Sequence, residues 1–182
     1  MNLSNHFLLA MPDLTGDYFA DSLIYVCQHD ADGAMGLIVN RPSDMVLAEL
    51  TAQIGLTTEV AVRDQDIFEG GPVAPDRGIV LHSGDQIFSG TTQVADTLYV
   101  STQIEALQAV AEGQGPARCM IALGYAGWGA GQLDHEIATN VWLSLPAEHD
   151  VLFDVEPAAR RDAAAAALGF DFRLIAARAG HA

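Results

Sequence analysis

The sequence predicts an α+β fold in one domain over residues 1–182, with helices beside a mixed β-sheet. Three observations favour this class. Short apolar runs rich in Val, Ile and Tyr occur mostly in adjacent pairs, and helical periods interrupt them irregularly instead of following every strand. Half of the 182 residues are hydrophobic. A chain of this length can bury roughly 70% of the surface that its unfolded form exposes, so one sizeable core is feasible.

The first 55 residues predict three strands and a helix. HFLLAM is typical of a short strand ended by Pro12, and SLIYVCQH and AMGLIVN flank the turn residues HDADGA as a hairpin. SDMVLAELTAQIG then places Val46, Leu50 and Ile54 at four-residue intervals, which is typical of an amphipathic helix. We expect Ser43 to cap that helix.

The middle of the chain predicts more strands around a second helix. DIFEGGPV, RGIVLHS and TLYVS are short strand-like runs, and ARCMIALGY is typical of a buried central strand. Between them, Thr102 is expected to cap a helix that buries Ile104, Leu107 and Ala111.

The last third returns to a helical period at Gln132, with Leu133, Ile137 and Val141 on one face and Trp142 beside it, and this helix is expected to end before Pro146. DVLF predicts a short strand. An alanine-rich helix should follow, with Pro157 in its first turn and Gly169 at its end. The run FDFRLIAA should then form a strand that closes the sheet.

The charge excludes several functions. The chain has 24 acidic and 8 basic residues, a net charge of −16, and every basic residue is arginine. Without lysine, a Schiff-base lysine, a P-loop lysine and a lysine general base are excluded. The acidic body would repel a phosphate backbone, so we do not expect direct binding to nucleic acid, and a basic partner protein or simple solubility suits the charge better.

We expect a cytoplasmic protein without a membrane segment. No run approaches the roughly 20 apolar residues that a membrane-spanning helix needs. The N-terminal apolar run FLLAM is shorter than a signal-peptide core and lacks a basic flank.

The stretch GYAGWGAGQLDHE, from Gly124 to Glu136, most resembles a ligand-binding loop. A dinucleotide-binding pattern would require glycine at Gln132, and carboxylates in the first helical turn would repel an anion. We therefore interpret the stretch as a strand-to-helix junction whose glycines allow positive φ and close packing. The alternative is a pocket for a neutral or cationic group, with four candidate contacts: Tyr125, Trp128, Asp134 and Glu136.

Catalytic and metal-binding patterns are weak. Asp134, His135 and Glu136 are consecutive, so on a helix they point about 100° apart and cannot all hold one ion. No serine lies in a nucleophile elbow, and adjacent residues such as His82 and Ser83 point to opposite faces of a strand. We expect no catalytic residue, metal site or cofactor.

Two alternatives with chemistry stay open. One is a hydrolase or metal-dependent enzyme built from His29, His82, Asp134 and Glu136. The other is a thiol redox sensor that pairs Cys27 with Cys119. Both cysteines lie in apolar, strand-like runs, where a buried small side chain is the simpler interpretation.

Six motifs follow one another along nearly the whole chain: LLAMPDL, SLIYVCQHDADGAMGLIVNRP, EGGPV, RGIVLH, LGYAGWGAGQLDHEIATNVWL and a closing Gly-His-Ala. Together they resemble the AlgH/YqgE family of small bacterial proteins. The resemblance implies a bifurcated or partly barrel-like β-sheet surrounded by helices. Members are often called transcriptional regulators, through an association with alginate production, although the family has no recognised DNA-binding motif or established enzyme activity.

Two positions depart from the family pattern. Arg161 stands where the last helix usually carries a tryptophan, which puts a shared surface role of that helix in doubt. Asp134 stands where GQLE is usual, which keeps the charge and shortens its reach by one methylene.

We therefore expect a non-enzymatic binding or regulatory protein that acts on transcription indirectly, through an unknown protein or small-molecule partner. The candidate binding surface combines the segment from Asn40 to Pro42, the segment from Gly70 to Pro72, His82, and the glycine-rich stretch. Its candidate contacts are Asn40, Arg41, Gly70, Gly71, His82, Tyr125, Trp128, Asp134 and Glu136.

Overall fold

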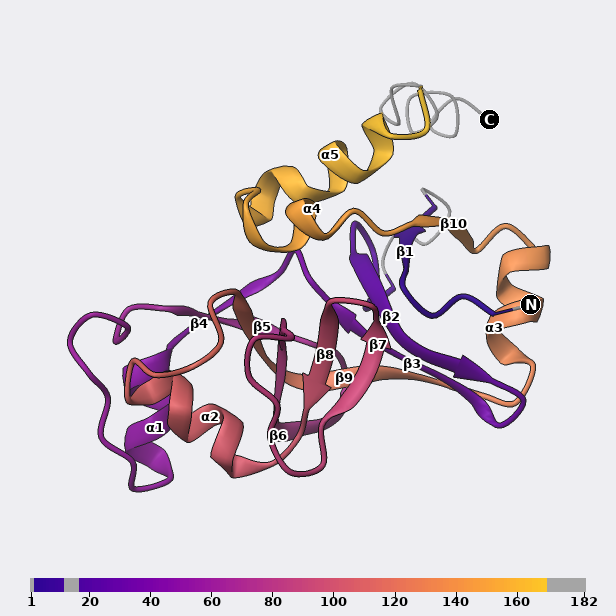
Figure 1. Ribbon diagram of the computed structural model, residues 1–182. Coiled ribbons are helices and arrows are strands. Elements are labelled where there is room, and N and C mark those ends of the chain that lie inside the picture. The colour runs from indigo at the N-terminus through magenta and orange to yellow at the C-terminus, as the bar shows by residue number, and fades with distance from the viewer. Residues whose placement is uncertain (1, 12–16, 170–182) are drawn as a thin grey trace. The chain divides into compact units, whose positions relative to one another are not determined.

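The computed structural model describes residues 2–11 and 17–169. The chain forms two compact units (Figure 1). The central unit runs from Pro42 to Tyr125, and the terminal unit combines the residues up to Arg41 with those from Ala126 onward. No helix in the described ranges is long and apolar enough to cross a membrane.

An antiparallel sheet builds the terminal unit, in the strand order β10, β1, β2, β3, β9. The strands are β1 (His6–Ala10), β2 (Leu23–Asp30), β3 (Gly33–Ile38), β9 (Cys119–Gly129) and β10 (Trp142–Pro146). β2 and β3 form the predicted hairpin, with Ile24 opposite Ile38 and Asp30 opposite Gly33. The predictions of the first strand and of this hairpin are confirmed.

Helices α3 (Gln132–Ala138), α4 (His149–Phe153) and α5 (Arg160–Ala166) complete the terminal unit, with the 3-10 helix η2 (Pro157–Ala159) leading into α5. Leu8, Ile24 and Ile38 are buried in one cluster with Trp128 and Trp142. Five consecutive β2 residues, Leu23 to Cys27, are all buried, so both faces of this strand are covered.

A second sheet region and two helices build the central unit. Strands β6 (Val73–Ser83), β8 (Leu98–Ser101) and β7 (Thr92–Ala95) follow β9 in antiparallel order, β5 (Asp66–Glu69) pairs with β9 in parallel, and β4 (Pro42–Val46) pairs with β5. Helices α1 (Leu47–Gln53) and α2 (Ile104–Ala111) contact each other. Their apolar faces share a core with the strands, formed by Leu47, Leu50, Ile67, Val80, Ala106, Leu107, Val110 and Ile121.

Strand β9 changes neighbours along its length, and this branches the sheet. Its residues 119–125 pair with β6, its residues 121–123 also pair with β5, and its residues 126–129 pair with β3. Parallel and antiparallel pairs therefore meet on one strand. The predicted α+β class with a mixed, bifurcated sheet is confirmed.

The glycine-rich stretch joins a strand to a helix as predicted, but the strand extends further along it than Tyr125, where the strand-like run ends. β9 continues to Gly129, and the turn is confined to Ala130 and Gly131, which precedes α3. Gly124 has φ of 70°, and a Cβ there would collide with the carbonyl oxygen of Gly71. A Cβ on Gly70 would collide with the carbonyl oxygen of Gly124, so these glycines let two backbones touch.

Both predicted caps of α1 and α2 were wrong. The Ser43 hydroxyl accepts a bond from the Met45 N–H over 3.1 Å within β4, and α1 begins four residues later, after Val46. The N-cap of α2 is Gln103 instead of Thr102. Ile54 and Ile104, which the helical period predicts to be buried, are 46% and 52% exposed.

The region after α3 also differs from the prediction. α3 ends at Ala138, and Asn140 has φ of 60°, so the chain turns before Trp142 enters β10 opposite Ala10. DVLF belongs to α4 instead of a strand. The predicted proline in the first turn is confirmed in η2, while FDFRLIAA and the closing Gly-His-Ala lie outside the described residues.

Candidate functional site

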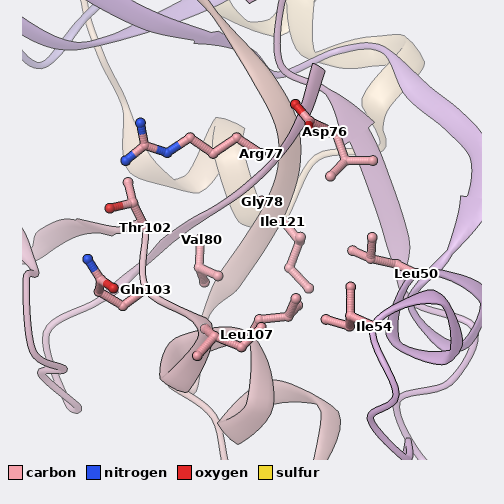
Figure 2. A pocket seen from close by; sticks show the side chains of 12 residues that line it. Leu50, Ile54, Asp76, Arg77, Gly78, Val80, Thr102, Gln103, Leu107 and Ile121 are labelled. Atoms are coloured by element: carbon pink, nitrogen blue, oxygen red, sulfur yellow. The ribbon is translucent and has the colours of Figure 1, made fainter. Parts of the chain in front are cut away.

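A pocket of about 200 Å³ opens in the central unit between α1, α2 and the strands β6 and β9 (Figure 2). Leu50, Val80, Leu107 and Ile121 contribute apolar side chains to its walls, and all four are buried. The half-exposed Ile54 and Ile104 extend this apolar surface. A concave, mostly apolar site with a few polar groups is the usual form of a small-molecule site.

Gly78 opens space for this pocket within β6. A Cβ at this position would have only one neighbouring atom within 4 Å, Cδ2 of Leu107 at 4.0 Å, and the φ of Gly78 is not in the left-handed region. Glycine inside a strand is unfavourable unless close approach or unusual backbone geometry requires it. At Gly78 no backbone approaches the position of a Cβ, and φ is not left-handed. The pairing of β6 with β9 is irregular only before this residue, between Val73 and Gly78.

Three hydrogen-bonding side chains lie on one side of the pocket. Arg77, Thr102 and Gln103 line it, with the guanidinium of Arg77 directed toward the Thr102 side (Figure 2). None of the three side chains has a hydrogen-bond or ion-pair partner among the described residues, so their donors are open to solvent or to a ligand. Asp76 lies on the other side.

His82 lies elsewhere in the central unit and is wholly buried. Its Nδ1–H donates to the Ser83 carbonyl oxygen over 2.8 Å, so its Nε2 accepts from the Ser101 hydroxyl, also over 2.8 Å. The ring stacks on Tyr99 and meets the edge of Phe88. This serine–histidine pair resembles a nucleophile and base in type, but both side chains are at 0% exposure and hold the strands together.

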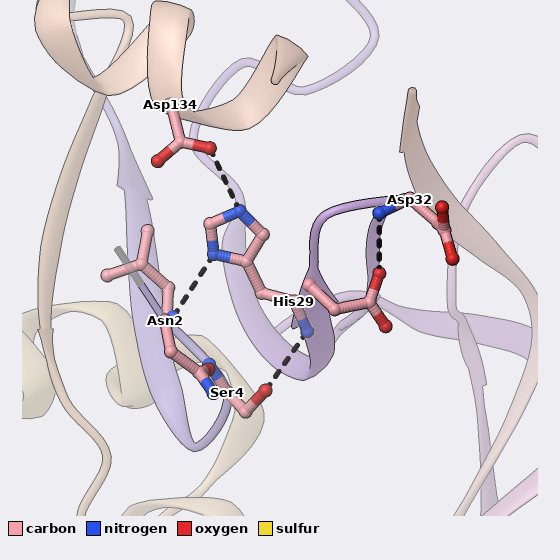
Figure 3. A network of polar contacts seen from close by, with 7 residues as sticks. Asn2, Ser4, His29, Asp32 and Asp134 are labelled. Atoms are coloured by element: carbon pink, nitrogen blue, oxygen red, sulfur yellow. Dashed lines mark hydrogen bonds and ion pairs between the residues drawn. The ribbon is translucent and has the colours of Figure 1, made fainter. Parts of the chain in front are cut away.

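His29, in the terminal unit, connects three segments (Figure 3). Its Nδ1 accepts from the Leu3 N–H over 3.1 Å, so the neutral ring carries its hydrogen on Nε2, which donates to Oδ2 of Asp134, also over 3.1 Å. The His29 N–H donates to the Ser4 hydroxyl over 3.0 Å. The network therefore ties the N-terminal residues and α3 to the end of β2.

Glu136 accepts hydrogen bonds from both tryptophans of the chain. The indole N–H groups of Trp128 and Trp142 each donate to its Oε2 over 2.8 Å, and Nε2 of Gln132 donates to its Oε1 over 2.9 Å. Gln132 is oriented in turn by the Gly129 N–H, which donates to its Oε1 over 3.0 Å. The carboxylate therefore accepts from both sides of this junction, twice from the strands β9 and β10 and once from its own helix.

Asn40 and Arg41 hold the loop before β2. The Asn40 side-chain oxygen accepts from the Leu23 N–H over 2.8 Å, and its amide donates to the Asp21 carbonyl over 2.9 Å. Arg41 donates to the carbonyls of Tyr18 and Ala20 and lies over the Tyr18 ring at 5.3 Å from its centroid.

Both cysteines are free thiols with raised pKa values. Cys27 is buried, and burial raises the pKa of its thiol. Cys119 is half-buried beside a hollow of about 250 Å³, and burial raises its pKa although a hydrogen bond from Gln65 opposes the shift. Raised pKa values disfavour the reactive thiolate. Within the part of the chain that the structure describes, no group of three His, Cys, Asp or Glu side chains could hold a metal ion.

The predicted site residues thus fall into local groups. Trp128 and Glu136 are brought together, and Asp134 contacts His29. The predicted surface draws on both units, so its assembly as one site stays a prediction. The pocket residues Arg77, Gly78, Thr102 and Gln103 were missed, and the one sequence signal was a glycine inside the strand-like run RGIVLH.

A family model described as AlgH-like matches residues 7–173, so the match spans both units. A UPF0301 protein of Stutzerimonas stutzeri is 50% identical over 182 residues, which cover 99% of this chain and 96% of that protein. A UPF0301 protein of Methylococcus capsulatus is 46% identical, with 98% and 96% covered. The chain belongs to the AlgH-like family, and the predicted family resemblance is confirmed.

Solved structures agree with this assignment. The solution structure of AlgH from Pseudomonas aeruginosa has a TM-score of 0.83 at 43% identity, and the match covers 100% of this chain and 97% of that one. A crystal structure from Corynebacterium diphtheriae has a TM-score of 0.68 at 19% identity, with 86% and 84% covered, and shares the fold.

Proposed function

We propose that this protein is a cytoplasmic, non-enzymatic binding protein that influences gene expression through a bound molecule, without contacting DNA itself. The pocket in the central unit carries this proposal. It combines apolar walls with hydrogen-bonding side chains that have no partner among the described residues, and no histidine, cysteine or serine lines it. It therefore has the features of a binding site and lacks the usual nucleophile–base pair.

The distribution of charge supports binding of a small molecule or a protein over binding of DNA. Between Pro42 and Tyr125 the sequence has eleven acidic residues and three arginines, a net charge of −8. Residues outside this range account for the remaining −8 of the total of −16. Neither unit offers the excess of positive charge on which affinity for a phosphate backbone depends.

The hydrogen bonds of the two candidate catalytic histidines favour structural roles. Both ring nitrogens of His82 and both ring nitrogens of His29 are bonded inside the fold. A general base needs a ring nitrogen within reach of a substrate proton. The enzyme alternative would therefore require these networks to rearrange.

A panel of small amphiphiles, screened by thermal shift and titration calorimetry, tests the proposal. We expect saturable stabilisation by at least one compound and its loss in Gly78→Leu, which places a side chain in the pocket. A parallel panel of ester, phosphate and peptide substrates should show no turnover. Turnover that disappears in His29→Ala or His82→Ala would establish the enzyme instead.

Two further measurements check the remaining parts of the proposal. Cell fractionation should recover the protein with the cytoplasmic fraction. Binding to DNA fragments should be absent at near-physiological salt; sequence-preferring binding under those conditions would contradict the proposal, because it could not arise from weak non-specific attraction.

A further inference from the structure

We infer that the pocket of the central unit binds a small aliphatic carboxylate, with the chain between α1 and α2 and the anionic head beside Arg77. The inference rests on the proposed binding function and names the class of ligand. It follows from the size of the pocket, the arrangement of its polar groups and the unexplained glycine in β6.

The size of the pocket limits the apolar part of the ligand. Its volume of about 200 Å³ is below the roughly 300–1,000 Å³ of sites for drug-sized molecules. Its inner walls are aliphatic: Leu50, Val80, Leu107 and Ile121 contribute no aromatic ring on which a planar group could stack. A short alkyl chain matches both the volume and the chemistry of these walls.

The polar groups determine the head of the ligand. Arg77 presents up to five N–H donors, and Thr102 and Gln103 can donate from the same side of the pocket. Arginine binds planar carboxylates with two parallel hydrogen bonds. The single carboxylate on the rim, Asp76, lies on the opposite side, so the head group is expected beside Arg77 and away from Asp76.

Arg77 differs from the other arginines of the central unit. Arg63 forms an ion pair with Asp64 over 3.7 Å, and Arg118 also has an interaction partner. Arg77 has neither a hydrogen bond nor an ion pair among the described residues. The unit as a whole has a net charge of −8 and repels anions. The guanidinium of Arg77 supplies a local positive charge beside the apolar pocket, and this charge is complementary to an anionic head group.

Gly78 gives independent support for the open pocket itself. Glycine in the middle of a strand is less favourable than alanine, and the space around Gly78 would accept a larger side chain. Such a side chain would occupy the pocket. An open pocket therefore accounts for a residue that the packing of the sheet does not require.

The experiment measures the affinity of the full-length protein for butanoate, hexanoate and octanoate by calorimetry and by methyl chemical shifts. Affinity should rise about fourfold per methylene until the pocket is filled, since each buried CH₂ contributes about 0.8 kcal/mol. The shift changes should centre on methyl groups of Leu50, Ile104 and Ile121. Hexylammonium and hexanol, which share the chain, should bind at least tenfold more weakly than hexanoate.

Two variants locate the site. Gly78→Leu should abolish binding, and Arg77→Gln should weaken hexanoate roughly tenfold while leaving hexanol unchanged. Arg63→Gln is the matched control, because it removes an equal charge from the same unit outside the pocket, and it should change affinity less than twofold. Arg77 is exposed, so the test survives if Gly78→Leu does not fold.

The outcomes separate this inference from the proposed function. Tighter binding of hexylammonium or hexanol in the same pocket would overturn the carboxylate assignment and leave a binding protein in place. Equal loss of hexanoate affinity in Arg77→Gln and Arg63→Gln would show that the affinity depends on the net charge of the unit and not on the position of Arg77. That result would also overturn the carboxylate assignment. If neither these probes nor the wider amphiphile panel binds, both the inference and the proposed function fail.

Discussion

Trp128 and Trp142 donate their indole N–H groups to the same carboxylate oxygen, Oε2 of Glu136, each over 2.8 Å. The two rings meet edge to face, with centroids 6.1 Å apart, and both are at least 93% buried, with exposures of 7% and 4%. The Glu136 side chain on α3 thus accepts hydrogen bonds from two strands, β9 and β10, that are not neighbours in the sheet. α3 is anchored to the terminal unit by this carboxylate.

Glu136→Ala should therefore destabilise the protein by about 2–4 kcal/mol, because each buried indole N–H loses its acceptor at a cost of about 1–3 kcal/mol. Glu136→Gln should cost less, since it keeps one oxygen but sets its amide against the Gln132 amide. Urea unfolding followed by tryptophan fluorescence measures both effects. Glu112→Ala, an exposed control at the C-cap of α2, should stay within about 0.5 kcal/mol of the parent protein; an equally small effect of Glu136→Ala would show that the indole bonds contribute nothing.

His29→Phe should leave the Leu3 N–H without its acceptor, while the bond from the backbone N–H of residue 29 to the Ser4 hydroxyl remains. We expect a loss of about 1–3 kcal/mol in the free energy of unfolding, together with faster amide hydrogen exchange at Leu3. Asp134→Asn keeps an oxygen that can accept from Nε2 of His29, so its effect should be below about 1 kcal/mol. Unchanged exchange at Leu3 in His29→Phe would contradict the bond to Nδ1.

The hairpin of β2 and β3 was predictable because its signals are local. Apolar runs flank turn residues, and the two strands are close in sequence. The Glu136 network was not predictable, because an acceptor shared by Trp128 and Trp142 depends on how β9 and β10 are placed by the rest of the sheet. Residue spacing carries no information about such long-range contacts, and it supported the incorrect extension of α3 to Trp142.

The pocket was missed for a related reason. A helical period identifies Ile54 and Ile104 as apolar, but it cannot tell whether another element covers them. In the structure nothing in the described ranges buries them fully, and they border the open space above Gly78. An apolar residue at a helix end that stays exposed can mark a binding site, and this distinction requires coordinates.

The buried thiol of Cys27 should lower the free energy of unfolding at high pH. Burial raises the pKa of Cys27 in the folded protein, whereas an unfolded thiol has a pKa of about 8.5. Above that pH the unfolded chain loses a proton that the folded chain retains, so the free energy of unfolding should fall as the pH rises from about 8.5. Unfolding curves at pH 7, 9 and 10 check this, and Cys27→Ala should show a shallower decline.

Alkylation provides the matching kinetic test. At pH 7.5 both cysteines should react with iodoacetamide more slowly than a free thiol, and the half-buried Cys119 should react before Cys27. Mass spectrometry after mild oxidation should find two free thiols. An intramolecular Cys27–Cys119 disulfide under those conditions would instead support the redox-sensor alternative.

Two glycines of the central unit should respond in opposite directions to the same substitution. Gly124→Ala introduces a Cβ at a φ of 70° and against the Gly71 carbonyl, so we expect a loss of at least about 2 kcal/mol. Gly78→Ala meets only Cδ2 of Leu107 at 4.0 Å, and by restricting the unfolded chain it should stabilise the protein by about 0.4–1 kcal/mol. Denaturant unfolding of the two variants compares them directly. A loss in Gly78→Ala as large as that in Gly124→Ala would mean that the backbone at position 78 requires glycine, and the open pocket would no longer be needed to explain it.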